Sequence, residues 1–151
     1  MILPIVQHPD PRLRQLCAPV FDVAELGGLI AEMFETMYAA SGRGLAAPQV
    51  GRLIRLFVMD CTWKEGERSP VVMINPEILS RSPETQRNEE GCLSIADHPV
   101  WVERPERIEV TWTDAQGAQR RGGFKGFAAA CVLHEIDHLD GVLIVDYEDK
   151  A

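Results

Sequence analysis

The sequence predicts an α+β fold in a single domain that spans residues 1–151. From residue 23 onward, apolar residues recur at three- and four-residue steps, the spacing of an amphipathic helix. Several short β-branched or alternating runs follow, joined by polar turns as in hairpins, and a second helix is expected at 127–139. Hairpin-connected strands with two substantial helices favour α+β over a parallel α/β sheet, and the length fits one domain.

The composition is that of an ordinary globular protein, with 46% hydrophobic and 25% charged residues. A net charge of −8 argues against a broad nucleic-acid surface, and no apolar run approaches the roughly 18 residues of a membrane span. The first residues lack the basic segment of a signal peptide. We therefore expect a cytoplasmic protein with no membrane partner and no sequence-specific nucleic-acid partner. The four cysteines have no CxxC pair, which suits a reducing compartment: Cys17, Cys61, Cys92 and Cys131.

Capping signals place the first helices. Asp10 is expected to cap a short helical piece from Pro11 to Leu16. Asp22 is expected to cap the long helix from Val23, and Ser41-Gly42 to end it, because glycine suits a left-handed C-cap. The stripe expected to face the core consists of Leu26, Leu29, Ile30, Met33, Phe34, Met37 and Tyr38.

The middle of the chain is predicted to be a loop followed by strands. Residues 42–49 contain two glycines, two alanines and a proline, so we expect a loop whose backbone can approach another molecule closely. Gln49 is its side-chain donor. The strands expected after it, with a turn at 114–117, are Ile54–Met59, Val71–Asn75, Ile78–Ser80, Val100–Val102, Arg107–Thr113, Ala118–Gly122 and Val142–Val145.

The second helix carries the sequence His-Glu-Ile-Asp-His at 134–138. His134 and His138 are one helical turn apart on one face, so they can bind one zinc or ferrous ion. Glu135 beside them can take a proton from an attacking water and pass it to a leaving group. Asp137 receives no role from the sequence. Two ligands do not complete a site, so further ligands must come from elsewhere.

Cys92, in the stretch Glu-Gly-Cys-Leu-Ser at 90–94, is a candidate third ligand. Taken alone it is more simply a small buried hydrophobe. A thiolate with two imidazoles, however, leaves the fourth position of the metal open, which is the arrangement of a catalytic site. Cys131 competes for this role, but a thiolate one turn before His134 would strain the histidine pair, so we interpret Cys131 as lining the pocket.

Three motifs in this order carry a family resemblance: GRGLAAPQ at 42–49, EGCLS at 90–94 and HEIDH at 134–138. They resemble the motifs of the peptide deformylases, as do HPDPRL at 8–13 and MFETMY at 33–38. The resemblance covers nearly the whole chain and implies antiparallel β-sheets packed around a central metal-binding helix. It also implies hydrolysis of the N-formyl group from the initiator methionine of nascent polypeptides, with one divalent ion per chain. For that ion the resemblance implies Fe²⁺ in the cell and Zn²⁺ or Ni²⁺ in the purified protein.

The resemblance implies a role for each site residue. Glu135 is the general acid/base, and the Gln49 side chain and the Leu93 backbone N–H hold the formyl oxygen. The implied metal ligands are Cys92, His134 and His138. The residues implied for binding the peptide substrate, in part through backbone groups as for an added strand, are Arg43, Gly44, Gly91, Asn88, Phe127, Ala130 and Cys131.

The chain departs from the family at several positions. Arg43 stands where a small aliphatic residue is usual, and Ala96 where a proline often occurs. Asn88, Phe127 and Ala130 occupy positions that line the methionine pocket in relatives, where aliphatic side chains are more usual. We expect Arg43 to shift preference toward substrates with an acidic or polar group near the formylated residue.

The expected domain lacks the further C-terminal helix of many relatives, because only thirteen residues follow His138. In such relatives that helix helps the enzyme to dock at the ribosomal exit tunnel. The expected partner is therefore the N-formylated nascent peptide, and docking to the ribosome stays open.

Other functions also stay open. A related amidohydrolase could act on a different N-formyl or N-acyl compound, and a catalytically silent paralogue could keep the metal for structure. Intact Glu135 and Gln49 favour an enzyme, because a structural site needs neither. A zincin-type protease is disfavoured, because its third ligand normally lies downstream of HExxH and little chain remains there.

Overall fold

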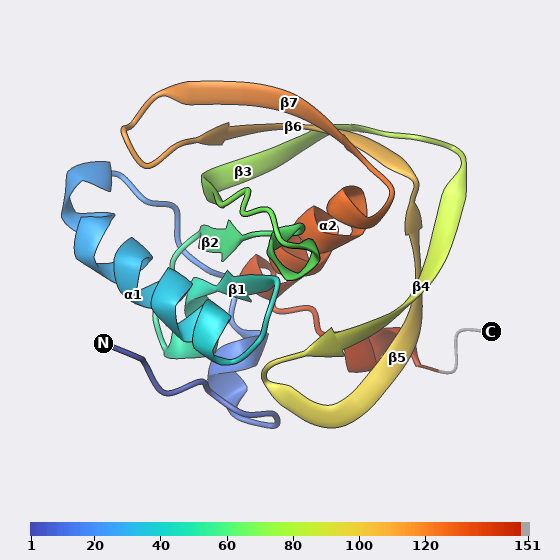
Figure 1. The fold of residues 1–151 in the computed structure, drawn as a ribbon, viewed down its shortest axis with the longest axis horizontal. Helices are drawn as coiled ribbons and strands as arrows, with labels where there is room; N and C mark the ends of the chain where they lie inside the picture. The colour runs from blue at the N-terminus through green and yellow to red at the C-terminus, as the bar shows by residue number, and fades with distance from the viewer. Residues whose placement is uncertain (149–151) are drawn as a thin grey trace.

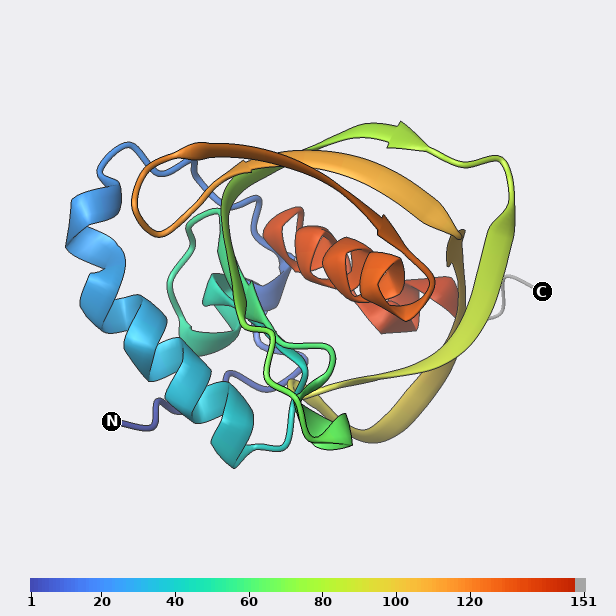
Figure 2. The same cartoon turned by 45° about the horizontal axis from the view of Figure 1, so that its top comes forward.

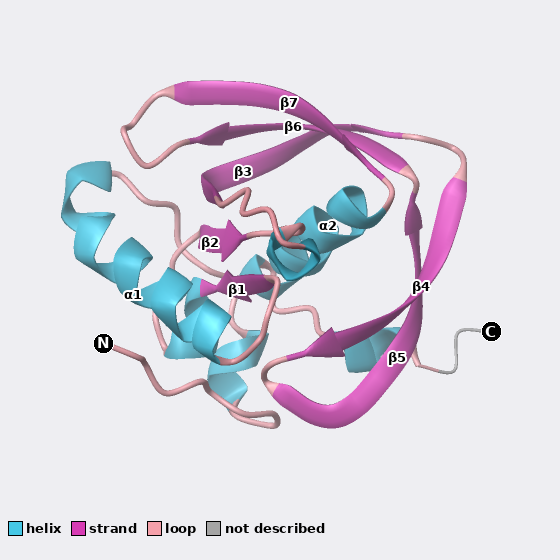
Figure 3. Cartoon of the chain, in the orientation of Figure 1, coloured by secondary structure: helices cyan, strands magenta, loops and turns pink. Residues whose placement is uncertain are grey.

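The computed structural model describes residues 1–148 (Figures 1 and 3). The helices are α1 (Gly27–Ala39) and α2 (Phe127–Leu139). The strands are β1 (Gly44–Ala46), β2 (Leu56–Met59), β3 (Val71–Arg81), β4 (Thr85–Cys92), β5 (Ile95–Pro105), β6 (Arg107–Thr113) and β7 (Gln119–Lys125). Short 3₁₀ helices connect them: η1 (Pro11–Arg14), η2 (Val23–Leu26), η3 (Ala47–Val50), η4 (Trp63–Glu65) and η5 (Ile144–Tyr147). The single domain predicted over 1–151 also includes 149–151, which lie outside the described residues.

The strands form two antiparallel sheets around α2. Five strands pair in the order β1-β2-β3-β6-β7, and β4 pairs with β5 in a separate hairpin. In Figures 1 and 2 the larger sheet curves over one side of α2, the hairpin closes another side, and α1 lies outside β1 and β2. The predicted α+β class, with antiparallel sheets around the helix that carries HExxH, is confirmed.

Helix α1 packs on the outer side of the larger sheet through the predicted stripe. Its first predicted turn is η2, capped by the Asp22 side chain, which accepts a hydrogen bond from Ala24 N–H at 3.2 Å. The α-helix itself begins at Gly27, so the two glycines, which are poor helix formers, lie in its first turn. The apolar residues that meet in this layer are Leu26, Ile30, Met33, Met37, Leu45, Leu56, Val58 and Ile74.

The end of α1 differs from the prediction by one residue. Ser41, not Gly42, has the left-handed conformation, with φ of 59°. Gly42 N–H donates to the Met37 carbonyl at 2.9 Å, and Ser41 N–H donates to Tyr38, which together close the helix as a Schellman motif. Gly42 is needed for a different reason, because a Cβ there would lie 2.6 Å from Leu93 Cδ1.

Helix α2 matches its predicted bounds and buries its apolar face against the larger sheet. Its first residue follows Gly126, whose carbonyl accepts a hydrogen bond from Gln86 Nε2 of β4 at 2.7 Å. The buried residues that meet in this core are Cys17, Ala46, Phe57, Met59, Met73, Ile108, Val110, Ala129, Val132, Leu133, Ile136 and Leu139. The sheet and β4 thus fix the position of α2 from two sides.

Several predicted elements were wrong or incomplete. The strand expected at Val142–Val145 is not formed, because Asp146 closes a local turn onto Leu143: its carboxylate accepts from Leu143 N–H, and its own N–H donates to the Leu143 carbonyl. The expected loop at 42–49 contains β1 and η3. Strand β4 was missed altogether, and the two runs within 71–80 form one strand, β3. No helix within residues 1–148 is long and apolar enough to cross a membrane.

Candidate metal centre

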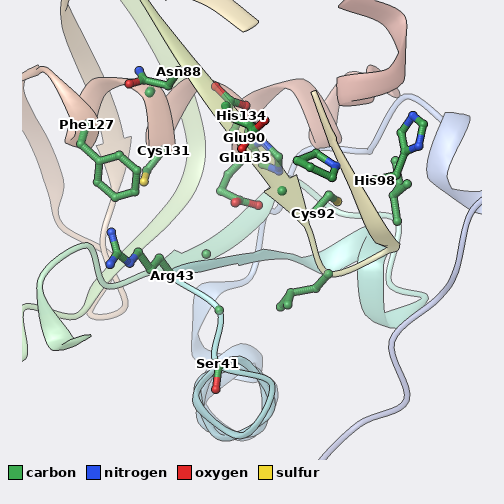
Figure 4. A pocket seen from close by; sticks show the side chains of 18 of the residues that line it. Ser41, Arg43, Asn88, Glu90, Cys92, His98, Phe127, Cys131, His134 and Glu135 are labelled. Carbon is green, nitrogen blue, oxygen red and sulfur yellow. Dashed lines mark hydrogen bonds and ion pairs between the residues drawn. The ribbon is translucent and has the colours of Figure 1, made fainter. Parts of the chain in front are cut away.

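Three candidate ligands converge from elements that are far apart in the sequence. Cys92 is the last residue of β4, whereas His134 and His138 lie on α2. Their donor atoms all lie within 4.8 Å of one another, and Cys92 Sγ is 3.4 Å from His138 Nε2. Figure 4 shows Cys92 beside the helix that carries His134. A thiolate and two imidazoles are a donor set that suits zinc or ferrous iron and leaves room for a further ligand.

The Glu90 carboxylate orients the His134 ring through a hydrogen bond. His134 Nδ1 lies 2.9 Å from Glu90 Oε1, so an Nδ1–H donates to Glu90 and Nε2 is the nitrogen available to a metal. Arg104 donates two further hydrogen bonds to Glu90, at 2.6 and 2.9 Å. Burial would raise the pKa of Glu90, but the hydrogen bonds from Arg104 and His134 outweigh it and lower that pKa. Glu90 therefore stays ionised and keeps His134 oriented.

The surroundings of the ligands favour positive charge. Burial would lower the pKa of His134, but Cys92, Glu135 and Glu90 raise that pKa well above its ordinary value. Burial and the neighbouring His134 lower the pKa of His138 well below its ordinary value. The site thus stabilises one positive charge at the two rings but disfavours protonation of both. A single metal cation, bound by both rings in their neutral form, fits this environment.

Asp137, which received no role from the sequence, belongs to the network behind His134. Its Oδ2 accepts hydrogen bonds from Arg104 Nη1 at 3.0 Å and from the Tyr147 hydroxyl at 2.7 Å. Arg104 is only 4% exposed. The positive charge of its guanidinium is neutralised by two carboxylates, Glu90 and Asp137. Sequence reasoning missed Arg104 and Tyr147, because the partners of Arg104 come from β4, α2 and η5 and leave no local pattern.

The Glu135 carboxylate lies beside the ligands and packs directly against Gly44 of β1. It is 4% exposed, and its Oε1 has no hydrogen-bond partner within the described part of the chain. Burial raises the pKa of Glu135 to about 7, with His134 acting in the opposite direction. A carboxyl group with a pKa near neutrality can both accept and donate a proton, which is the property of a general acid/base.

The Gln49 amide is locked in place with its N–H groups toward Cys92. Gln49 Oε1 accepts from Ala46 N–H at 2.9 Å, so the amide cannot turn over without losing that bond. Gln49 Nε2 donates to Ser94 Oγ at 3.0 Å and lies 3.7 Å from Cys92 Sγ. The sequence indicated Gln49 but not Ser94, which is buried and sets the direction of the amide.

Nearly all the predicted site residues line one pocket of about 530 Å³ (Figure 4). The exception is His138, which is buried and does not reach the pocket surface. The predicted residues that do line it are Arg43, Gly44, Gln49, Asn88, Gly91, Cys92, Leu93, Phe127, Ala130, Cys131, His134 and Glu135. Segments from β1, η3, β4 and α2 therefore meet at this pocket.

Arg43 lies at the edge of the pocket, where its positive charge is paired with Glu65. The Arg43 guanidinium lies 4.9 Å from the centre of the Phe127 ring, and Arg43 Nη2 lies 3.2 Å from Glu65 Oε1. Phe127 remains 47% exposed, with its ring beside Cys131 in Figure 4. Asn88 donates to Gln86 Oε1 at 3.0 Å. The predicted charge of Arg43 thus lies at the pocket edge, but partly compensated by Glu65.

Comparison with known proteins gives consistent matches. The profile of the polypeptide deformylase family matches residues 2–151. A peptide deformylase from Afipia carboxidovorans is 48% identical over 147 residues, which are 97% of this chain and 86% of that protein. The crystal structure of peptide deformylase from Thermotoga maritima superposes with a TM-score of 0.91 at 46% identity, covering 97% of both chains. The Met-Ala-Ser-bound class I type b peptide deformylase from Acinetobacter baumannii superposes with a TM-score of 0.90 at 36% identity, covering 97% of this chain and 98% of that one.

Proposed function

The chain belongs to the polypeptide deformylase family and removes the N-terminal formyl group from nascent peptides, and we propose that Cys92, His134 and His138 hold its metal ion. The observation that carries this proposal is the convergence of these three donors and the Glu135 carboxylate at one pocket. The reaction hydrolyses the amide between the formyl group and the methionine nitrogen and releases formate.

The three donors suit a divalent metal ion, which supplies chemistry that the side chains of the protein do not. When bound, such an ion activates water and polarises the formyl carbonyl as a Lewis acid. We propose Fe²⁺ as the ion in the cell, because a thiolate ligand gives more charge than imidazole and suits an oxidisable ferrous ion. Zn²⁺ and Ni²⁺ accept the same donors and are expected in aerobically purified protein.

Glu135 moves the proton in this proposal. Its carboxylate takes a proton from the water that attacks the formyl carbon and later delivers one to the leaving amine. The pKa of about 7 supports both steps at neutral pH. Glu90 and Arg104 take no part in the transfer; they hold His134 in its orientation through the hydrogen bonds described above.

Gln49 and Leu93 stabilise the oxygen of the formyl group. The Gln49 N–H groups point toward Cys92, and Leu93 follows Cys92 directly, so a carbonyl oxygen beside the ligands is within reach of both. Negative charge develops on that oxygen in the transition state, and a fixed donor there typically contributes about 3–4 kcal/mol to lowering the barrier.

The substrate is a peptide that begins with formylmethionine. Met-Ala-Ser, which is bound in the relative from Acinetobacter baumannii, is what remains when formyl-Met-Ala-Ser loses its formyl group. We infer that the methionine side chain enters the part of the pocket lined by Phe127, Ala130 and Cys131. Arg43, Gly44 and Gly91 line the pocket, and we propose that backbone groups of this set pair with an extended peptide substrate.

The enzyme is proposed to act in the cytoplasm, where formylated chains emerge from the ribosome. The proposed partner there is the N-formylated nascent peptide.

The test is formate release from formyl-Met-Ala-Ser by anaerobically prepared Fe²⁺ protein. Glu135→Ala should retain the metal and lose about 10²–10⁴-fold in rate, the usual contribution of a general acid/base. Glu103→Ala, which removes an exposed carboxylate from β5 outside the pocket, serves as the matched control and should keep its rate. The proposal fails if metal-loaded wild type releases formate no faster than Glu135→Ala.

A further inference from the structure

Tyr147 of η5 contacts both elements that carry the candidate ligands, although it does not line the pocket. Its hydroxyl donates to Asp137 Oδ2 of α2 at 2.7 Å. Its ring lies against Arg104 of β5, with the guanidinium carbon 5.2 Å from the ring centre. In Figure 1 η5 is the short red helix beside β5. Tyr147 thus joins the helix and the hairpin, and the proposed reaction gives it no role.

The Tyr147 ring is fixed by packing, and its hydroxyl stays a donor. The ring packs against an apolar cluster that also takes in Cys92, the candidate ligand at the end of β4. Burial raises the pKa of Tyr147 to about 12, and the hydrogen bond to Asp137 acts in the same direction. The hydroxyl therefore keeps its proton at neutral pH. The buried members of the cluster are Val6, Leu13, Ile95, Val100, Val102, Leu143 and Ile144.

A continuous series of hydrogen bonds leads from Tyr147 to the His134 ring. Asp137 Oδ2, which accepts from the Tyr147 hydroxyl, also accepts from Arg104 Nη1 at 3.0 Å. Arg104 Nη2 donates to Glu90 Oε1 at 2.9 Å, and the same oxygen lies 2.9 Å from His134 Nδ1. A displacement of Asp137 is therefore passed to the oxygen that orients the ligand.

The weakest point of this series is the Asp137 carboxylate. Its side chain is 23% exposed, whereas that of Arg104 is only 4% exposed. Without the Tyr147 hydroxyl, the carboxylate can turn toward water and leave Arg104 Nη1, because water can replace a partner for Asp137 more readily than for Arg104. The hydroxyl prevents this by holding the same oxygen that faces the guanidinium.

We propose that Tyr147 is a positioning residue for the metal ligand His134, acting through Asp137, Arg104 and Glu90. Side chains that support a ligand from outside fix its orientation and thereby tune metal affinity. Tyr147 contributes no donor to the metal, so its loss should change the orientation of His134 and leave the donor set unchanged. The inference rests on the proposed metal site.

The test compares two tyrosines in matched surroundings. Tyr147→Phe removes the hydroxyl and keeps the ring. Tyr38→Phe is the control, because the Tyr38 hydroxyl donates to Asp60 Oδ2 at 2.6 Å and the guanidinium carbon of Arg68 lies 4.3 Å from its ring centre. Tyr38 does not line the pocket. Each variant loses one bond from a hydroxyl to a carboxylate, so chemical denaturation of the metal-free proteins should show similar losses of stability.

Only Tyr147→Phe should bind metal more weakly. The affinity for Co²⁺ is measured by competition with a chelating dye, which needs no substrate. We expect a loss of about 10-fold, the lower end of the range of about 10–100-fold for residues that support a ligand. The visible bands of bound Co²⁺ report the ligand geometry and should shift in Tyr147→Phe but not in Tyr38→Phe. Asp137→Asn, which removes the charge facing Arg104, should weaken binding at least as much.

Equal Co²⁺ affinities of Tyr147→Phe and Tyr38→Phe would overturn the inference, as would Co²⁺ bands in Tyr147→Phe that match the wild type, because Tyr147 would then support the fold alone. Wild type that binds no Co²⁺ would overturn the proposed metal site and this inference together. The expected difference between the two variants, found in a protein that releases no formate, would support the inference and count only against the proposed catalytic roles.

Discussion

Gly44 of β1 and Glu135 of α2 lie so close that position 44 has no room for a side chain. A Cβ added to Gly44 would lie 2.4 Å from Glu135 Oε2 and 2.9 Å from Cδ. Both distances are well below ordinary van der Waals contact, so the backbone of β1 forms the wall against which the carboxylate rests. The position of Glu135, the proposed proton-transfer group, is therefore determined by a residue on another element.

Gly44→Ala should displace the Glu135 carboxylate and reduce catalysis while leaving the metal in place. A shift of about 1 Å in a catalytic group can cost roughly 10²-fold in rate, so we expect a loss of about that size in kcat/KM. Steady-state kinetics on formyl-Met-Ala-Ser, with metal content measured in parallel, checks this. Unchanged kcat/KM in a folded Gly44→Ala protein would contradict it.

Gly28→Ala is the matched control for that substitution. A Cβ at Gly28 meets no atom within 4 Å, and the residue lies within α1. Alanine at such a helical position should stabilise the protein by about 0.4–1 kcal/mol. Chemical denaturation should show this gain with activity unchanged, and a loss of stability would contradict the open environment found at Gly28.

Glu90→Gln should weaken metal binding without removing a ligand. Glu90 accepts from His134 and from Arg104, and neutral glutamine gives both bonds less strength. Substitutions of such supporting residues typically cost about 10–100-fold in metal affinity, and we expect a loss in this range from competition with a chelating dye. Glu84→Gln, which changes an exposed pair with Arg107, is the control. Equal affinities for the two variants would contradict the orienting role of Glu90.

Asp60→Asn should change the stability of the protein in a pH-dependent way. Burial would raise the pKa of Asp60, but hydrogen bonds from Tyr38, Ser69 and Thr62 outweigh it and lower that pKa. A carboxylate with a lowered pKa stabilises the fold fully above its unfolded value, about 3.9, and loses this contribution as pH falls through the folded value.

The measurement is the difference in unfolding free energy between wild type and Asp60→Asn. This free-energy difference should be constant from pH 7 to about pH 5. It should decrease below about pH 4, because the Asp60 carboxylate of the wild type then becomes protonated. Release of metal in acid affects both proteins and cancels in the difference. A difference that widens on acidification would show that the pKa of Asp60 is raised instead.

Arg43→Ile should reduce any preference for peptides with an acidic residue after the formylmethionine. The guanidinium lies at the pocket edge, but its pairing with Glu65 limits the effect to that of an exposed ion pair. We expect a change of about 2–5-fold in the ratio of kcat/KM for acidic and neutral peptides, corresponding to up to about 1 kcal/mol. Arg52→Ile, an exposed position outside the pocket, controls for net charge. An unchanged peptide profile in Arg43→Ile would contradict the prediction.

The helices could be predicted from the sequence because their signals are local. The apolar stripe of α1 and the bounds of α2 were recovered, and the metal cluster followed from His134, His138 and Cys92 taken together. The stripe of α1 and the histidine pair each lie within one helix, so they required no knowledge of which segments meet in space. Cys92 lies on another element and was indicated only by combining its motif with the histidine pair.

Strand β4 could not be predicted for a reason connected with function. Its residues alternate between exposed and partly buried, as in an ordinary strand, but the inward side chains Gln86, Asn88, Glu90 and Cys92 are not apolar hydrocarbons. They face the start of α2 and the candidate metal centre, so the alternation of apolar and polar residues that identifies a half-buried strand is missing. The pairing of β4 with β5 supplies the order that its own sequence does not indicate.

The run Val142–Val145 was predicted to be a strand, but the structure forms none there. Four apolar residues predicted a strand, and Leu143 and Ile144 are indeed buried. They are buried through a turn that Asp146 closes, without a partner strand. Burial and strand formation were confused because hydrophobicity reports only the first of them. The network through Arg104 was invisible for a related reason, since its members are brought together only by the fold.

The placement of the ligands also has a consequence for how the protein is turned over. Within residues 1–148 the β4–β5 hairpin pairs with no strand of the larger sheet, and Cys92 at its end faces two histidines on α2. An ion bound by all three ties the hairpin to the helix, so metal occupancy and folding are thermodynamically linked. At a free-ion concentration a hundred times the Kd, this linkage is worth about 2.7 kcal/mol. Metal depletion would then do more than silence the enzyme: it would remove this part of the folding free energy and raise the unfolded fraction that proteases cleave, so that metal supply affects the lifetime of the protein as well as its activity.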